Sequence, residues 1–192
     1  MASPTADKTN VKPRRKRRWF QFGLPTLLGL VTLSAVVLGL IVNSAERQRR
    51  AVAAVRSLGG VVYYEDDKPF AAGPPFWLRK WFGPDYIANV VAVYLTDTHV
   101  GDAGLESLTG LTRLQVLDLS NTRISDAGLA HLSALTGLRT LYLYNTPVSD
   151  AGLEHLKALT GLRELYLDNG QLSDAGLAEL RAALPHCDIQ GP

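Results

Sequence analysis

Carboxylates are the residues whose spacing most suggests chemistry in this chain. The tetrapeptide Asp-Ala-Gly-Leu occurs four times at intervals of 24 residues, beginning at Asp102, Asp126, Asp150 and Asp174. Stacked on one side of a repetitive fold, these carboxylates would offer a metal ion a line of oxygen ligands. Each Asp also follows a turn and precedes a leucine-spaced segment, where its oxygens suit free backbone N–H groups and its charge suits a helix dipole. We therefore predict that they cap helices and that no metal or other cofactor is bound.

The other reactive side chains do not assemble into a recognisable catalytic set. His131 and His155 recur at equivalent positions, but two imidazoles without a third ligand are weak evidence for zinc. Cys187 is the single cysteine, so it forms no intrachain disulfide, and next to His186 it is predicted to pack. Motifs such as HExxH, CxxC and GxSxG are absent. We predict a binding protein and no enzyme, with a hydrolase or metal binder as a rare alternative.

The elements that position these residues follow from the same 24-residue period. The units begin at Val93, Leu117, Leu141 and Leu165 with VYLTDTHV, LDLSNTRI, LYLYNTPV and LYLDNGQL, in which apolar residues alternate as in a strand. The second half of a unit spaces its leucines by three, which favours a short α- or 3₁₀-helix. A repeat of this length predicts a solenoid, in which each unit buries its apolar side against its neighbours.

The repeat motif resembles the leucine-rich repeat family. The pattern LxxLxLxxTxI starts at Leu114, recurs at Val90 and Leu138, and the resemblance covers residues 88–189. It implies a mixed α/β solenoid, with parallel strands on a concave face and short helices on a convex face. The family usually has Asn or Cys where this chain has Thr98, Thr122 and Thr146, and we expect these hydroxyls to bond loop backbone. Gly170 departs from the pattern, which predicts a looser last turn.

The resemblance implies that a partner binds the concave strand face. The outward positions there supply aromatic area with polar tips, which suits a protein, peptide or glycan. Tyr is also simply a good strand residue. The candidate binding residues are Tyr94, Asp118, Tyr142, Tyr144, Glu164, Tyr166 and Asp168, with Asn121, Asn145 and Asn169 beside them.

An apolar segment near the N-terminus predicts a membrane anchor. No charged residue occurs from Trp19 to Ala45, and the 19 residues from Leu24 to Val42 are nearly all apolar. As a helix they would rise roughly 28 Å, which is close to the thickness of the hydrocarbon core. We predict an uncleaved single-pass helix. The alternative is a cleaved signal peptide, whose apolar region is usually shorter, and which would give a secreted protein.

The charges on either side of this segment predict its orientation. Seven basic residues precede it and four follow closely, so the N-terminus is expected in the cytoplasm and the repeats outside. Residues 44–192 contain 13 Lys and Arg against 17 Asp and Glu, which speaks against a nucleic-acid partner.

The segment order completes the sequence prediction. We expect a basic tail over 1–18, the anchor over 19–43, a juxtamembrane helix from Ser44 over 44–60, an N-terminal cap over 61–88 and the repeat domain over 89–192. The cap contains Val61–Tyr64 as a strand and the aromatic segment 76–82. This combination resembles the membrane-anchored leucine-rich repeat proteins of planctomycete bacteria, and it implies an interaction module. The alternative is an envelope-organising protein that associates laterally with itself, and the oligomeric state stays open.

Overall fold

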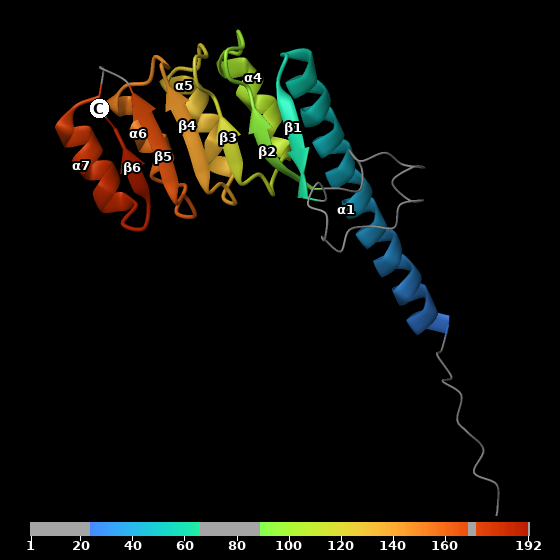
Figure 1. The fold of residues 1–192 in the computed structure, drawn as a ribbon. Coiled ribbons are helices and arrows are strands. Elements are labelled where there is room, and N and C mark those ends of the chain that lie inside the picture. The colour runs from blue at the N-terminus through green and yellow to red at the C-terminus, as the bar shows by residue number, and fades with distance from the viewer. Residues whose placement is uncertain (1–23, 66–88, 169–171, 192) are drawn as a thin grey trace, which may run out of the picture. The chain divides into compact units, whose positions relative to one another are not determined.

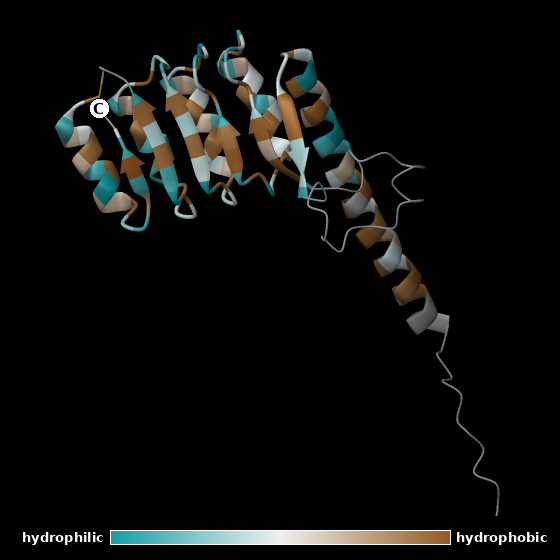
Figure 2. Ribbon diagram, viewed as in Figure 1, coloured by the Kyte–Doolittle hydropathy of each residue, from teal (hydrophilic) through white to brown (hydrophobic). Residues whose placement is uncertain are grey.

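The computed structural model of the chain describes residues 24–65, 89–168 and 172–191. The chain separates into two compact units, Met1–Gly39 and Leu40–Pro192. The described part of the first unit belongs to helix α1 (Leu24–Ser57). An 18-residue window of this helix has a mean hydropathy of 2.1 and no buried residues, and Figure 2 shows its N-terminal part as mostly hydrophobic. By length and composition, α1 is able to cross a membrane.

The second unit is built on a six-stranded sheet in which the strands follow chain order. Strands β2 to β6 pair in parallel, whereas β1 pairs with β2 in antiparallel orientation. Residues that pair on neighbouring parallel strands are 24 positions apart in the sequence, since Val93 lies beside Leu117 and Leu117 lies beside Leu141. The predicted α/β repeat fold is thereby confirmed. The strands are β1 (Val61–Tyr64), β2 (Val90–Tyr94), β3 (Val116–Asp118), β4 (Thr140–Tyr144), β5 (Glu164–Asp168) and β6 (Asp188–Gln190).

Short helical segments connect the parallel strands and lie on one face of the sheet (Figure 1). Two of the connections continue from α- into 3₁₀-helix, as predicted from leucines spaced by three, because a 3₁₀-helix has three residues per turn. The segments are α4 (Asp102–Glu106), η2 (Ser107–Gly110), α5 (Asp126–Leu129), η3 (Ala130–Ala134), α6 (Asp150–Leu156) and α7 (Asp174–Ala183).

The core lies between these helices and the sheet. Alternate strand residues such as Leu141 and Leu143 are fully buried there, and so are the helix-side leucines Leu129 and Leu132. Figure 2 accordingly shows brown and pale segments along the same strands. The alternation gives the sheet two different faces. We call the face opposite the helices the open face.

The C-terminal part of α1 packs on the first repeat. Its Ala51, Val52 and Val55 are buried in the same core cluster as the repeat leucines, and Arg56 donates a hydrogen bond of 3.0 Å to the Tyr64 hydroxyl on β1. This differs from the predicted separate helix starting at Ser44, since α1 runs through that position without a break. The predicted strand over Val61–Tyr64 is confirmed, while the aromatic segment 76–82, predicted as a cap, lies outside the described residues.

Candidate binding surface

The turns that end the strands share a left-handed residue. Asp97, Asn121 and Asn145 have φ values of 59°, 56° and 49°, which Asp and Asn tolerate better than other non-glycine residues. The Asn145 side chain donates a hydrogen bond of 2.9 Å to Asn121 Oδ1 in the preceding repeat. These two asparagines, expected to flank a ligand, therefore brace neighbouring turns. Asn169 and Gly170 lie outside the described residues.

The threonine hydroxyls bond loop backbone as predicted. Thr98, Thr122 and Thr146 each donate a hydrogen bond to the carbonyl three residues earlier, at 2.6, 2.6 and 2.8 Å. The hydroxyls of Thr122 and Thr146 are buried, so these bonds satisfy polar groups that would otherwise be costly inside the fold.

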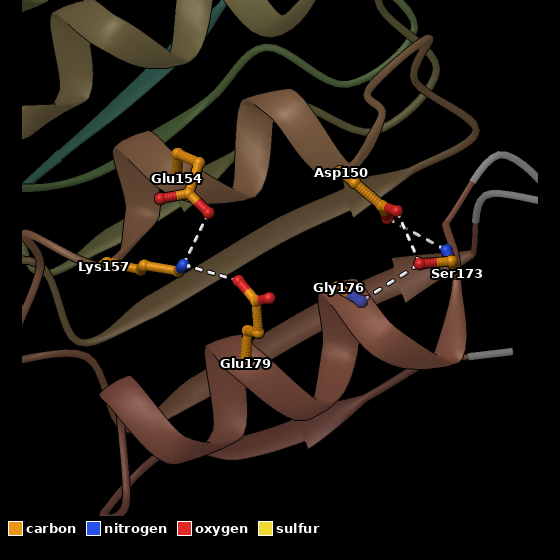
Figure 3. A network of polar contacts seen from close by, with 6 residues as sticks. All are labelled: Asp150, Glu154, Lys157, Ser173, Gly176 and Glu179. Atoms are coloured by element: carbon orange, nitrogen blue, oxygen red, sulfur yellow. Dashed lines mark hydrogen bonds and ion pairs between the residues drawn. The ribbon is translucent and has the colours of Figure 1, made fainter.

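The repeated aspartates connect successive repeats rather than cap their own helices. Asp126 begins α5, and its two carboxylate oxygens accept hydrogen bonds from the Ser149 amide (2.8 Å) and hydroxyl (2.6 Å) before α6. Asp102 with Ser125 and Asp150 with Ser173 repeat this arrangement, the last pair being drawn in Figure 3. The predicted position in the first helical turn is confirmed. The predicted helix-capping bond is wrong, because the backbone amide that is bonded belongs to the next repeat.

Both oxygens of these carboxylates are used in the protein itself, so the arrangement is structural. The hydrogen bonds from Ser173 hold the pKa of Asp150 below its ordinary value, since they stabilise the charged form. The glycines of the second, third and fourth Asp-Ala-Gly-Leu units make room for the carboxylate of the preceding unit; a Cβ at Gly152, for example, would overlap Asp126 Oδ1. Within the described ranges, no group of three or more His, Cys, Asp or Glu side chains is arranged to hold a metal ion.

The remaining reactive side chains come from different elements. His131 is in η3 and His155 in α6, on the helix side of the sheet. Burial raises the pKa of the Cys187 thiol to about 11, with contributions from Asp188 and Glu164, so the thiol stays protonated at neutral pH. Lys157 bridges Glu154 of its own helix and Glu179 of α7, at 2.5 and 3.1 Å (Figure 3).

The candidate binding residues lie together on the open face. Tyr94, Asp118, Tyr142 and Tyr166 form one cross-strand row, because each is paired in register with the next. Tyr144 pairs with Asp168 one step along the strands, and Glu164 pairs with Thr140 one step in the other direction. The structure therefore brings all seven predicted residues onto strands β2 to β5 of a single surface.

Three of these tyrosines pack against one another. The rings of Tyr142 and Tyr166 are stacked with centroids 4.6 Å apart and an interplanar angle of 8°. The centroid of the Tyr144 ring lies 6.3 Å from that of Tyr142 and 5.9 Å from that of Tyr166, and Tyr144 is 37% exposed. Desolvation raises the pKa values of Tyr142 and Tyr166, and Glu164 raises both further, so the hydroxyls remain donors at neutral pH. The result is a rigid aromatic surface with polar edges.

The open face is acidic. Its outward positions on the described strands β2 to β6 contain no Lys, Arg or His. The carboxylates at these positions are those of Asp118, Glu164, Asp168 and Asp188. Thr140 donates a hydrogen bond of 3.2 Å to Glu164 Oε2, and the Ser120 amide donates one of 2.9 Å to Asp118 Oδ1. Two of the carboxylates are thus oriented by neutral donors.

A shallow hollow of about 520 Å³ lies away from the open face, where α1 meets η2. Its lining mixes basic Arg47 and Arg50 with acidic Glu106, and Arg50 also lies 3.8 Å from Glu46 in an exposed pair. Such pairs contribute little energy and define no particular ligand. The hollow is lined by Arg47, Arg50, Glu106, Ser107, Thr109 and Gly110.

Comparison with known proteins gives a match to one family description over part of the repeat region. Residues 112–155 match the family description leucine rich repeats (2 copies). This match identifies two leucine-rich repeats within that segment. No curated protein matches the chain. Among solved structures, internalin C2 from Listeria monocytogenes is similar at 32% sequence identity with a TM-score of 0.37; the alignment covers 45% of this chain and 38% of that one. The match thus spans well under half of the internalin.

The repeat domain has open-face residues that the sequence did not predict. Tyr63 of β1 contacts Tyr94 edge to face, with ring centroids 5.5 Å apart. Asp188 and Gln190 extend the face onto β6 by pairing with Glu164 and Tyr166. The register of the 24-residue repeat would have found the last two, whereas Tyr63 required knowledge of the antiparallel pairing of β1, which the repeat does not contain.

Proposed function

We propose that the protein is a membrane-tethered interaction module that binds a partner protein or peptide through the open face of its leucine-rich repeats. Leucine-rich repeat domains typically bind proteins, and the outward residues of the open face differ from one repeat to the next. The conserved spacing of Asp, Gly and Leu builds the scaffold, so specificity falls to the positions between them. Catalysis has no comparable support, because neighbouring repeats place like residues side by side.

The observation that carries this proposal is the group of Tyr142, Tyr144 and Tyr166. Their rings pack against one another, and this packing restricts their rotamers before any partner binds. Ordered tyrosines lose little conformational entropy on binding, and they are enriched where interfaces concentrate their energy. The alternative explanation, that Tyr merely fits a strand, does not account for three of them gathering at β4 and β5.

We also propose that α1 is an uncleaved anchor with the repeats on the outer side of the membrane. The length and apolar composition of the helix support a span, and the basic residues 8–18 support a cytoplasmic N-terminus. Together with the segment order, these features support kinship with the membrane-anchored leucine-rich repeat proteins of planctomycete bacteria.

Photo-crosslinking in intact cells tests the binding proposal. A benzophenone amino acid replaces Tyr144 on the open face, and a matched control places it at His155, which is exposed on the helix side. We expect a defined partner to be caught from position 144 and not from position 155. Crosslinks only between copies of this chain would instead support lateral self-association.

A double variant provides the energetic test. Tyr142→Ala combined with Tyr166→Ala removes the stacked pair, whose side chains lie outside the core, so the melting temperature should change little. Loss of both anchors should weaken partner binding by at least about a hundredfold, as for hot-spot tyrosines elsewhere. Binding by the folded double variant at the level of the original protein would exclude the open face.

A further inference from the structure

We infer that the open face binds a cationic segment of its partner, with a Lys or Arg side chain of that segment seated over Asp118 between Tyr94 and Tyr142. The inference rests on the proposed function and specifies the chemistry of the partner. It follows from three independent features of the described strands: the register of the row, the direction in which its tyrosines pair, and the sign of the charge.

The register places one short acid between two long aromatic side chains. Tyr94, Asp118 and Tyr142 are direct neighbours on β2, β3 and β4. Strands in a sheet are about 4.8 Å apart, so the two tyrosine backbones are separated by roughly 10 Å with the aspartate between them. Because an Asp side chain is much shorter than a Tyr side chain, the difference in length implies a recess in the row, with a carboxylate at its base. Asp118 is partly buried in this recess.

The flanking tyrosines pair away from the recess. Tyr94 contacts Tyr63 on β1, and Tyr142 stacks on Tyr166 on β5, so each has its aromatic partner on the side remote from Asp118. Because the Tyr142 ring stacks across the strands, its second face is turned toward β3. A cation over Asp118 would lie within about 6 Å of aromatic rings on both sides, which is the range of a cation–π interaction.

The negative charge of the open face favours a cationic partner segment. The outward positions of β2 to β6 carry four carboxylates and no basic residue, so a neutral or anionic segment would leave the acids uncompensated or repelled. Glu164, Asp168 and Asp188 lie around Tyr166 and offer positions for further cationic side chains. The electrostatic effect of Asp118 on Tyr142, which helps to raise the pKa of that tyrosine, is consistent with their proximity.

The shape of the surface favours a protein segment over a small amine. Small-molecule sites are enclosed clefts that bury most of the ligand, whereas this recess is open along a sheet face. Five parallel strands at about 4.8 Å spacing present a row roughly 19 Å long, which accommodates about six extended residues of a peptide. An Arg or Lys side chain inserted from such a segment combines the ion pair with aromatic contact on its stem.

Peptide binding to the full-length protein in a non-ionic detergent tests the inference. The probes are fluorescent decalysine and decaglutamate, followed by anisotropy. We expect decalysine to bind through the open face, whereas decaglutamate should bind only the basic tail, so that its affinity does not change in Asp118→Asn. Asp118→Asn keeps the acceptor for the Ser120 amide and removes only the charge, and it should weaken decalysine binding about tenfold. Glu154→Gln is the matched control, because it removes one exposed charge on the helix side, and should change the affinity less than twofold.

Three results would overturn the inference. These are equal effects of Asp118→Asn and Glu154→Gln on decalysine binding, an equal effect of Asp118→Asn on decaglutamate binding, and unchanged decalysine binding in a folded Tyr142→Ala variant. The partner caught from position 144 separates this inference from the proposed function. If that partner binds the Asp118→Asn variant normally, the cationic segment is wrong while open-face binding stands. If position 144 catches no partner, open-face binding itself fails.

Discussion

At the scale of single residues, the Asp-Ala-Gly-Leu unit joins each repeat to the next by hydrogen bonds and close packing. Asp126 reaches forward to Ser149, and Gly152 leaves the space in which that carboxylate lies. The spacing alone predicted that the Asp and Leu are scaffold. It did not predict that Asp bonds the following repeat, because a carboxylate near a helix start has backbone donors within reach on both its own chain segment and the next one.

Gly152→Ala should therefore destabilise the protein. The added Cβ would overlap Asp126 Oδ1, which two hydrogen bonds hold in place, so either the carboxylate or the backbone must shift. Such overpacking typically costs about 1–3 kcal/mol. The free energy of unfolding, measured in urea by circular dichroism, checks this.

Gly101→Ser is the matched control for that substitution. A Cβ at Gly101 meets nothing within 4 Å, and the new hydroxyl would occupy the helix-start position that Ser125 and Ser149 hold in later repeats. Its free energy of unfolding should be unchanged or higher. Equal stability of the Gly152→Ala variant and the original protein would contradict the interlocking explanation.

At the scale of elements, each helix start depends on the repeat before it. The Ser173 hydroxyl donates to Asp150 at 2.5 Å and accepts from the Gly176 amide at 3.0 Å, so one side chain both caps α7 and connects α6 to it (Figure 3). A cap of this kind satisfies backbone donors that have no partner inside the helix. Cooperation between neighbouring repeats is thus built into the ends of the helices as well as into the leucine core.

Ser173→Ala should lower the stability at neutral pH, because the loss of a Ser N-cap costs about 1 kcal/mol. The folded-state pKa of Asp150 is below its ordinary value of 3.8, so the stabilisation from its charged form is present above that pH and is lost as the pH falls through the folded-state pKa. The difference between the variant and the original protein should accordingly shrink between pH 7 and pH 3. Urea unfolding at both pH values measures it, and a difference that grows in acid would refute the role of Asp150.

The elements also mark the limit of prediction from sequence. Strands and 3₁₀ turns were predictable because the same apolar periodicity occurs in four successive repeats. The continuous helix α1 was not, since Ser44 has the character of a helix cap while no proline or glycine pair interrupts the chain there. The burial of Ala51, Val52 and Val55 depends on the repeat that they cover, and a single amphipathic turn does not identify its partner.

At the scale of the whole molecule, the proposals require the repeats and the N-terminus to be on opposite sides of a membrane. The candidate binding row was largely predictable, because the strand register follows from the repeat period. The charge of the surface as a whole and the packing of its tyrosines became visible only in the structure. An acidic binding face directed away from the cytoplasm would meet cationic partners outside the cell or on its envelope.

Cysteine labelling tests this topology. Ala134→Cys on the exposed helix side and Ala6→Cys in the basic tail are introduced separately into a Cys187→Ala background. In sealed right-side-out vesicles, an impermeant maleimide should label position 134 and spare position 6 until detergent is added. The reverse pattern would invert the orientation, and N-terminal sequencing that begins near Ala45 would replace the anchor with a cleaved signal peptide.

The contact between Asp126 of one repeat and Ser149 and Gly152 of the next has an evolutionary consequence. Because Asp126, Ser149 and Gly152 satisfy one another across a junction, an in-frame duplication of one 24-residue unit creates a new junction with the same three groups already in place. A lineage can therefore lengthen the domain by a gene-level copying error without first repairing the scaffold. The copied strand also arrives with its outward residues free to diverge, so the reach of the surface and its chemical preference can evolve in separate steps.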